Sequence, residues 1–135
     1  MNVFWTVVYS IELLVSFSPV LMLLYFGVLH FFPAVIMVLI GNLSGFFVII
    51  PTALGILGSW GVIQLFVNII YPECEFENPT ATKCCLVCGF AVSIYLLCAQ
   101  EVGALLTFPS IIFAAPMVVA IHFTYLNRSK LLEKS

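Results

Sequence analysis

The chain has 135 residues, of which 64% are hydrophobic and only 7% are charged, whereas typical soluble domains contain about 25% charged residues. This composition argues against a water-soluble fold. With a formal net charge of −2 and four basic residues, the chain has too little positive charge to neutralise phosphates, so nucleic-acid binding is excluded as well. The predicted fold class is all-α, a polytopic integral membrane helical bundle.

The first apolar block covers residues 3–71 and carries a single charged residue, Glu12. One helical span takes about 20 residues, because the hydrocarbon core is about 30 Å thick and a helix rises about 1.5 Å per residue. The block is therefore long enough for three spans. Turns are predicted at Pro33 and Pro51, because proline removes a backbone donor and disfavours helical geometry in the preceding residue. In the alternative, residues 34–71 form one long helix kinked at Pro51.

The second apolar block, residues 84–126, is long enough for two spans with a hairpin turn at 107–110. The polar loop 72–83 and the polar tail 127–135 are predicted to lie outside the bilayer. Residues 1–135 are thus expected to form one transmembrane bundle of five spans, or of four spans in the alternative.

The orientation of the bundle is predicted from its basic residues, which are Lys83, Arg128, Lys130 and Lys134. Two spans between residues 84 and 126 would place all four on one side of the membrane. Positive charge is retained on the cytoplasmic side, so the C-terminus of this multi-pass membrane protein is expected to be cytoplasmic. The N-terminus then lies outside with five spans and inside with four.

Small residues occur at helical spacing in two places, Gly41 with Gly45 and Gly55 with Ser59. Small side chains let membrane helices approach closely, and dispersion contacts then hold them together. These four residues are therefore candidate helix-packing positions, although glycine is also simply common in membrane helices.

Polar side chains within the predicted spans are the candidate functional residues: Glu12, Glu101, Gln100, His30 and His122. Five spans place the two glutamates at similar depth on one side, where they could share a proton or bind a cation, with Gln100 orienting Glu101. Alternatively, each glutamate is protonated and makes a structural hydrogen bond. In a third interpretation, an ionised glutamate takes its cation from another subunit, because the spans contain no lysine or arginine. The histidines are expected toward the opposite face, as the end of a proton path or as interfacial hydrogen-bonding groups.

Three cysteines cluster in the sequence Lys83-Cys84-Cys85-Leu-Val-Cys88. A helix is predicted to begin here, where exposed amides and the neighbouring lysine would stabilise a thiolate. The CxxC of Cys85 and Cys88 resembles that of the membrane thiol oxidoreductases of the DsbB and VKOR types. This resemblance implies a small helical bundle, a bound quinone and redox roles for these two cysteines. Those enzymes use a second cysteine pair, whereas this chain offers only Cys74 and Cys98.

The same cysteines have two other interpretations. Juxtamembrane Cys84, Cys85 and Cys88 are suited to S-palmitoylation in a eukaryotic cell, and apolar cysteines also serve simply as packing residues. The paired CxxC spacing typical of zinc sites is absent, so no metal site is predicted.

The sequence favours a non-enzymatic role without a cofactor. The small extramembrane surface, the small-residue motifs and the unpartnered carboxylates predict an accessory subunit or assembly factor that packs against a larger membrane protein complex. Its expected partners are the lipid bilayer and other transmembrane subunits. One alternative is a small proton- or cation-coupled transporter or channel that uses Glu12 and Glu101, and a second is a DsbB/VKOR-like oxidoreductase that uses Cys85 and Cys88.

Overall fold

The computed structural model describes residues 3–73, 78–98 and 108–132, and the side chains of all of these except 108–113 and 132. The described residues form helices and connecting turns, without a β-strand. The long helices α1, α2 with its preceding 3-10 turn, and α3 are long and apolar enough to cross a membrane. The all-α prediction is confirmed, and these helices are compatible with a membrane protein. The elements are α1 (Val3–Leu39), η1 (Leu43–Gly45), α2 (Phe46–Ile70), α3 (Pro79–Cys98), α4 (Phe108–Leu126) and α5 (Arg128–Leu132).

The first apolar block forms two helices, so the predicted breaks at its prolines are wrong. Pro33 lies inside α1 and Pro51 lies inside α2. A proline in a membrane helix removes one backbone hydrogen bond, and neighbouring helices can compensate for that loss. The alternative helix over 34–71 is wrong too, because α1 ends at Leu39. The five-span count, which needed three helices here, is not confirmed.

The break between α1 and α2 occurs at Gly41, whose φ of 87° is left-handed. The amide of Asn42 donates to the carbonyl of Met37 over 2.9 Å, and the amide of Gly41 donates to that of Val38 over 3.0 Å. These two bonds form a Schellman motif, which satisfies the last carbonyls of a helix and favours glycine at the left-handed position. The Asn42 side chain then accepts a bond from the amide of Ser44 and starts η1.

Helix α3 begins five residues before the predicted start at Cys84. Asn78 accepts a hydrogen bond from the amide of Ala81 through its side-chain oxygen, over 3.1 Å. Pro79 takes the first helical position, where its missing N–H and fixed φ are favourable. The predicted loop 72–83 is therefore helical from Pro79 onward.

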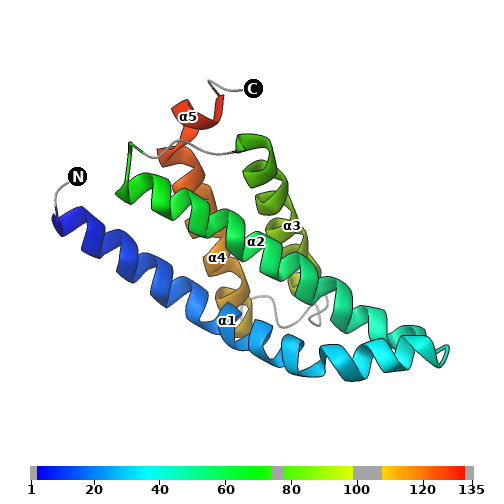
Figure 1. Ribbon diagram of the computed structural model, residues 1–135. Coiled ribbons are helices and arrows are strands. Elements are labelled where there is room, and N and C mark those ends of the chain that lie inside the picture. The colour runs from blue at the N-terminus through cyan, green and yellow to red at the C-terminus, as the bar shows by residue number, and fades with distance from the viewer. Residues whose placement is uncertain (1–2, 74–77, 99–107, 133–135) are drawn as a thin grey trace.

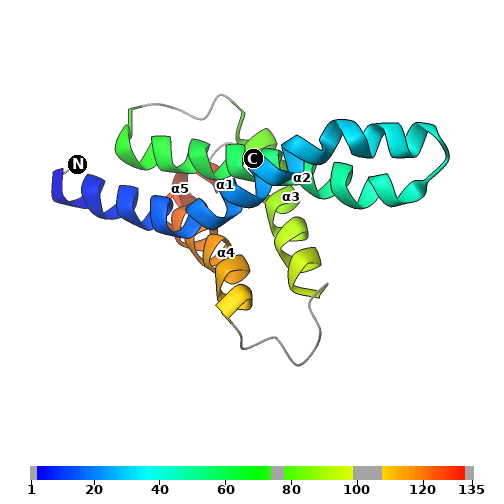
Figure 2. The same ribbon diagram turned by 90° about the horizontal axis from the view of Figure 1, so that it is seen from below.

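The helices are arranged as a long α1–α2 hairpin with α3 and α4 packed on it (Figure 1). Seen from below, α1 and α2 run together while α3 and α4 cross them and extend to one side (Figure 2). The beginning of α1, the end of α2, the end of α4 and α5 meet at one end of the molecule. The far end of the hairpin, which contains Gly41, extends beyond α3 and α4.

The buried core lies near the end where α1 begins and α4 ends. Leu65 of α2 and Phe123 of α4 are completely buried there. Asn127 is also buried, and its side-chain amide donates to the carbonyls of Leu65 (3.2 Å) and Phe123 (3.0 Å). Leu131 of α5 belongs to the same cluster, and Lys130 donates to the carbonyl of Pro72. The first part of the predicted tail is thus folded against the helices.

Candidate functional site

Glu12 of α1 and His122 of α4 form a polar contact between helices that are far apart in sequence. Glu12 Oε1 lies 2.7 Å from His122 Nδ1, and the side chains are 26% and 42% exposed respectively. A carboxylate at this distance accepts a hydrogen bond from the imidazole N–H, and the contact is an ion pair when the histidine is protonated. Glu12 therefore has a polar partner within this chain. The inference that an ionised glutamate takes its cation from another subunit stays a prediction.

The contact also corrects the predicted position of His122, which was placed toward the face opposite Glu12. That expectation assumed five spans, in which the first and last helices begin and end on opposite sides. Because the first block forms two helices, the start of α1 and the end of α4 lie at the same end of the bundle. One helix fewer brings His122 to Glu12.

Aromatic rings pack around the Glu12–His122 contact. The Tyr9 ring meets the His122 ring edge to face with centroids 6.1 Å apart, and it meets Phe123 in the same way. Trp5 stacks on Tyr9 at 5.9 Å, and Phe66 stacks on Phe123 at 6.0 Å. Such ring pairs contribute about 0.5 to 1.5 kcal/mol beyond their burial. These neighbours fix the orientation of His122 and connect the polar contact to the buried core.

Among the other polar candidates, only His30 is a described residue, and it does not take part in this contact. Glu101 and Gln100 lie outside the described residues, so their predicted pairing with Glu12 stays a prediction. His30 is exposed, and its Nδ1 lies 2.8 Å from the carbonyl of Phe26 in its own helix. It lies on α1 about 27 Å beyond Glu12, given the helical rise of about 1.5 Å per residue, so no direct hydrogen bond connects the two.

The small residues have different roles from one another. Gly41 has no described atom within 4 Å of the place where a Cβ would stand, so it serves the turn and not a helix contact within this chain. A Cβ on Gly45 would collide with the carbonyl of Ala34 in α1. A Cβ on Gly55 would lie 2.8 Å from Leu24, also in α1. Ser59 donates to the carbonyl of Gly55 within its own helix.

A close approach of α2 and α3 involves glycines that the sequence analysis missed. A Cβ on Gly58 of α2 would lie 2.9 Å from the amide nitrogen of Gly89 of α3, and a Cβ on Gly61 would lie 3.0 Å from Cys85. The repeated three-residue spacing of Gly55, Gly58 and Gly61 was the signal available in the sequence. This spacing gives α2 a second surface of small residues, which faces α3.

The cysteine cluster lies within α3 and not at its beginning. Because the helix starts at Pro79, Cys85 is in its second turn and Cys88 follows one turn later. The thiols of Cys84, Cys85, Cys88 and Cys98 are free. The unpaired amides of a helix are confined to its first turn, so the expected activation of Cys85 and Cys88 by these amides is wrong. Among the described residues no group of histidine, cysteine or acidic side chains could hold a metal ion, and Cys74 lies outside them.

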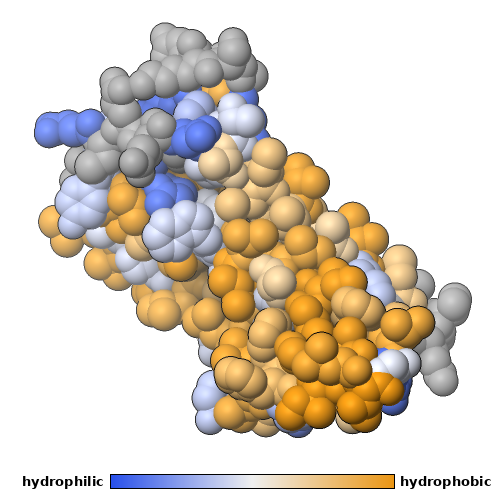
Figure 3. Space-filling view, turned by 45° about the vertical axis from the view of Figure 1, so that its right-hand side comes forward, coloured by the Kyte–Doolittle hydropathy of each residue, from blue (hydrophilic) through white to orange (hydrophobic). Residues whose placement is uncertain are grey.

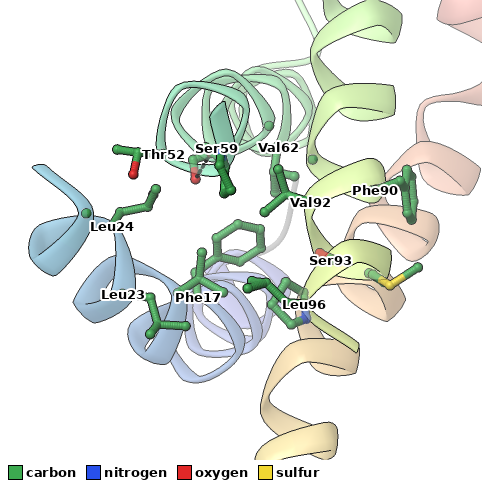
Figure 4. Close-up of a pocket in the computed structure, with 18 of the residues that line it drawn as sticks. Phe17, Leu23, Leu24, Thr52, Ser59, Val62, Phe90, Val92, Ser93 and Leu96 are labelled. Carbon is green, nitrogen blue, oxygen red and sulfur yellow. Dashed lines mark hydrogen bonds between the residues drawn. The ribbon is translucent and has the colours of Figure 1, made fainter. Parts of the chain in front are cut away.

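A cavity of about 270 Å³ lies where the middle portions of α1, α2, α3 and α4 meet. Side chains from α1, α2 and α3 surround it in Figure 4, including Phe17, Leu24, Thr52, Val62 and Val92. Thr52, Ser59 and Ser93 contribute hydroxyl groups, and the other lining side chains are apolar. The sequence analysis did not predict this cavity, because its lining residues are spread over four helices.

These features can be set beside known proteins. Comparisons with protein-family models, with curated protein sequences and with solved structures found no match to this chain.

Proposed function

We propose that this chain is a membrane-embedded accessory subunit or assembly factor, and that the tip of its α1–α2 hairpin packs against an apolar helix of a larger membrane protein. The tip is defined as residues 28–50. The observation that carries the proposal is that this segment extends beyond α3 and α4 with its apolar side chains uncovered (Figures 1 and 2).

Helix lengths support this proposal. The 20 residues of α3 and the 19 of α4 correspond to about 30 Å and 28 Å, which match a hydrocarbon core of about 30 Å. The 37 residues of α1 correspond to about 55 Å. A helix of that length fits the core only when tilted by nearly 60°, whereas membrane helices are usually tilted by about 0 to 40°. A partner that covers the tip would relieve this mismatch.

The surface of the tip has the composition of a helix-packing surface. Phe32, Leu39 and Ile40 are exposed by 78%, 80% and 76%, and Figure 3 shows hydrophobic side chains covering this part of the molecule. Among residues 28–50, only Ala34 and Gly45 are buried. The two helices therefore contact each other through small residues and leave their large side chains for lipid or for a partner.

The proposal includes a four-span topology in which the start of α1 and the end of α4 are both on the cytoplasmic side. Arg128 and Lys130 lie at the end of the molecule where α1 begins and α4 ends. The positive-inside preference makes that end cytoplasmic. Because the four helices α1 to α4 alternate in direction, the start of α1 and the end of α4 lie on the same side of the membrane.

The test is site-specific photocrosslinking in native membranes, with a photoreactive amino acid in place of Leu39 at the tip. The matched control carries it in place of Val118, which is exposed on α4. We expect a discrete protein adduct from position 39 and only lipid adducts from position 118. The accessory role is contradicted when position 39 also yields only lipid adducts and the chain migrates alone on native gels after mild detergent extraction.

The Glu12–His122 contact favours a second candidate, a proton- or cation-coupled transporter or channel. Carboxylate and imidazole groups inside a membrane bundle are the usual components of proton relays. Purified protein in liposomes should then carry a proton or cation flux that Glu12→Gln and His122→Gln each reduce. Equal flux in wild type, in both variants and in empty liposomes would exclude this candidate.

A further inference from the structure

We propose that the cavity between α1, α2, α3 and α4 binds one acyl chain of a membrane phospholipid. The hairpin tip contributes only Phe47 and Val48 to the wall of this cavity, and the proposal does not rest on the accessory role.

The position of the cavity along the helices favours a hydrocarbon ligand. Gly58 stands halfway along α2, Gly89 halfway along α3, and Pro116 near the middle of α4. The α1 residues of the wall, Phe17 to Gly27, surround the midpoint of that helix as well. For helices that cross a bilayer, these midpoints lie near the centre of the hydrocarbon core. The component present there in quantity is the lipid acyl chain.

The chemistry of the wall excludes charged and strongly polar ligands. None of the described lining residues is charged. Of the three hydroxyl groups, that of Ser59 already donates to the carbonyl of Gly55 over 2.9 Å. A charged headgroup or an ion would be left without partners here, at a large desolvation penalty. The mostly apolar lining favours an apolar ligand over water.

The shape of the cavity follows from close backbone contacts that prevent it from closing. Gly58 and Gly89 already touch, so α2 and α3 cannot move closer together. On the other side, Gly27 lies against Thr52 and Gly55 against Leu24, so α1 cannot move closer to α2. These contacts hold the helices apart around a space that no side chain of the described residues fills. The space is partly open at its edge, which gives a lipid chain a way in.

The first test uses phosphatidylcholine with a diazirine at the end of one acyl chain, mixed into phosphatidylcholine vesicles that hold the full chain. After irradiation, labelled residues are identified by mass spectrometry. We expect labelling concentrated on lining residues such as Leu24, Val92 and Leu96. Labelling of these residues no stronger than that of lipid-facing Leu14 and Val87 would overturn the proposal.

Two matched variants on α3 separate the cavity from the general lipid surface. Ser93 lines the cavity, whereas the adjacent Ile94 is exposed and does not. We expect Ser93→Phe to reduce labelling of Leu24 by about tenfold or more, because a filled site cannot also hold a ligand. Ile94→Phe should leave that labelling unchanged, and equal effects of the two variants would overturn the proposal. Val20→Phe, on the opposite wall, serves in place of Ser93→Phe if that variant does not fold.

Native mass spectrometry then identifies the occupant by its mass. Wild type and Ile94→Phe should retain one phospholipid per chain after other lipids have been removed, and Ser93→Phe should retain none. A retained free fatty acid or isoprenoid, or a chain without any bound lipid, would contradict a phospholipid site.

Discussion

Glu12 and His122 stand 110 positions apart in the chain, and their contact joins α1 to α4. Each side chain is partly exposed, so the contact has modest energy on its own. Hydrogen bonds between membrane helices contribute about 0.6 kcal/mol on average and up to about 1.7 kcal/mol. The neighbouring Tyr9 and Phe123 rings add packing to the same junction. The pair therefore helps to select the arrangement of α1 on α4 more than it raises the overall stability.

A double-mutant cycle measures this coupling. We expect Glu12→Ala and His122→Ala to show a coupling of about 0.6 to 1.7 kcal/mol, because each substitution removes the same hydrogen bond. The measurement is unfolding by sodium dodecyl sulfate in mixed micelles, followed by circular dichroism.

A control cycle pairs His122→Ala with Ser18→Ala. Ser18 is an exposed residue of α1, the helix that carries Glu12. The coupling in this control cycle should be near zero. A coupling between positions 12 and 122 as small as that of the control would show that the contact is not formed in the folded protein.

At the scale of elements, α2 is the central helix because its two surfaces of small residues face two different neighbours. Gly55 is placed against α1, whereas Gly58 and Gly61 are placed against α3. Without a hydrophobic driving force between helices in lipid, such close approach supplies the dispersion contacts that hold a bundle together. A substitution that fills one of these two surfaces of α2 should therefore weaken its contact with one neighbouring helix and leave its contact with the other unchanged.

Gly58→Ala tests this view of α2. The new methyl group would collide with the backbone of Gly89, and neither backbone can move away without opening the α2–α3 contact. We expect a loss of about 1 to 3 kcal/mol in unfolding free energy, which is typical of overpacking, measured by the same detergent titration.

The matched control is Ala53→Leu, which adds a larger side chain at an exposed position on α2. It should change the unfolding free energy by less than about 0.5 kcal/mol. If both substitutions have the same small effect, the Gly58–Gly89 contact is not a close one.

At the scale of the whole molecule, the two ends differ in character. The polar groups of Asn127, Lys130 and Arg128 gather where α1 begins and α4 ends, and the opposite, apolar end is the hairpin tip. This asymmetry predicts that the start of α1 and the end of α4 face the same side of the membrane.

The prediction is checked with single-cysteine variants in a cysteine-free background. Val3→Cys and Ser129→Cys should react with a membrane-impermeant maleimide from the same side, and that side should be cytoplasmic. Labelling from opposite sides would restore an odd number of spans. Leu57→Cys, near the middle of α2 and exposed, serves as the control and should stay unlabelled from either side.

The sequence was sufficient to predict an all-α fold with helices compatible with a membrane protein, because its apolar blocks are each long enough for more than one span. It was insufficient to locate the first turn. Pro33 and Pro51 are strong local signals, yet tertiary context accommodates both within helices, whereas Gly41 breaks the chain through its left-handed φ. That single error reversed the direction of every later helix and so concealed the partner of Glu12.

Other features of the site could not be read from one helix at a time. The Gly58–Gly89 contact and the cavity depend on which faces of α2 and α3 meet, and periodicity within each helix does not determine that pairing. The cysteine cluster was misplaced for a local reason. Asn78 and Pro79 form a good helix start, and this start lies upstream of the cysteines.

The short turn at Gly41 has a consequence for how the chain enters the membrane during its synthesis. Only three residues, 40–42, connect α1 to η1, and this connection contains no charge. Membrane insertion therefore meets no charged loop that must be carried across or held back, and α1 and α2 can enter together as one helical hairpin. The first basic residue, Lys83, is made only after both helices. In the proposed four-span topology, the basic residues that set the orientation follow the hairpin in the chain. We therefore expect the nascent hairpin to acquire its direction from the residues that follow it.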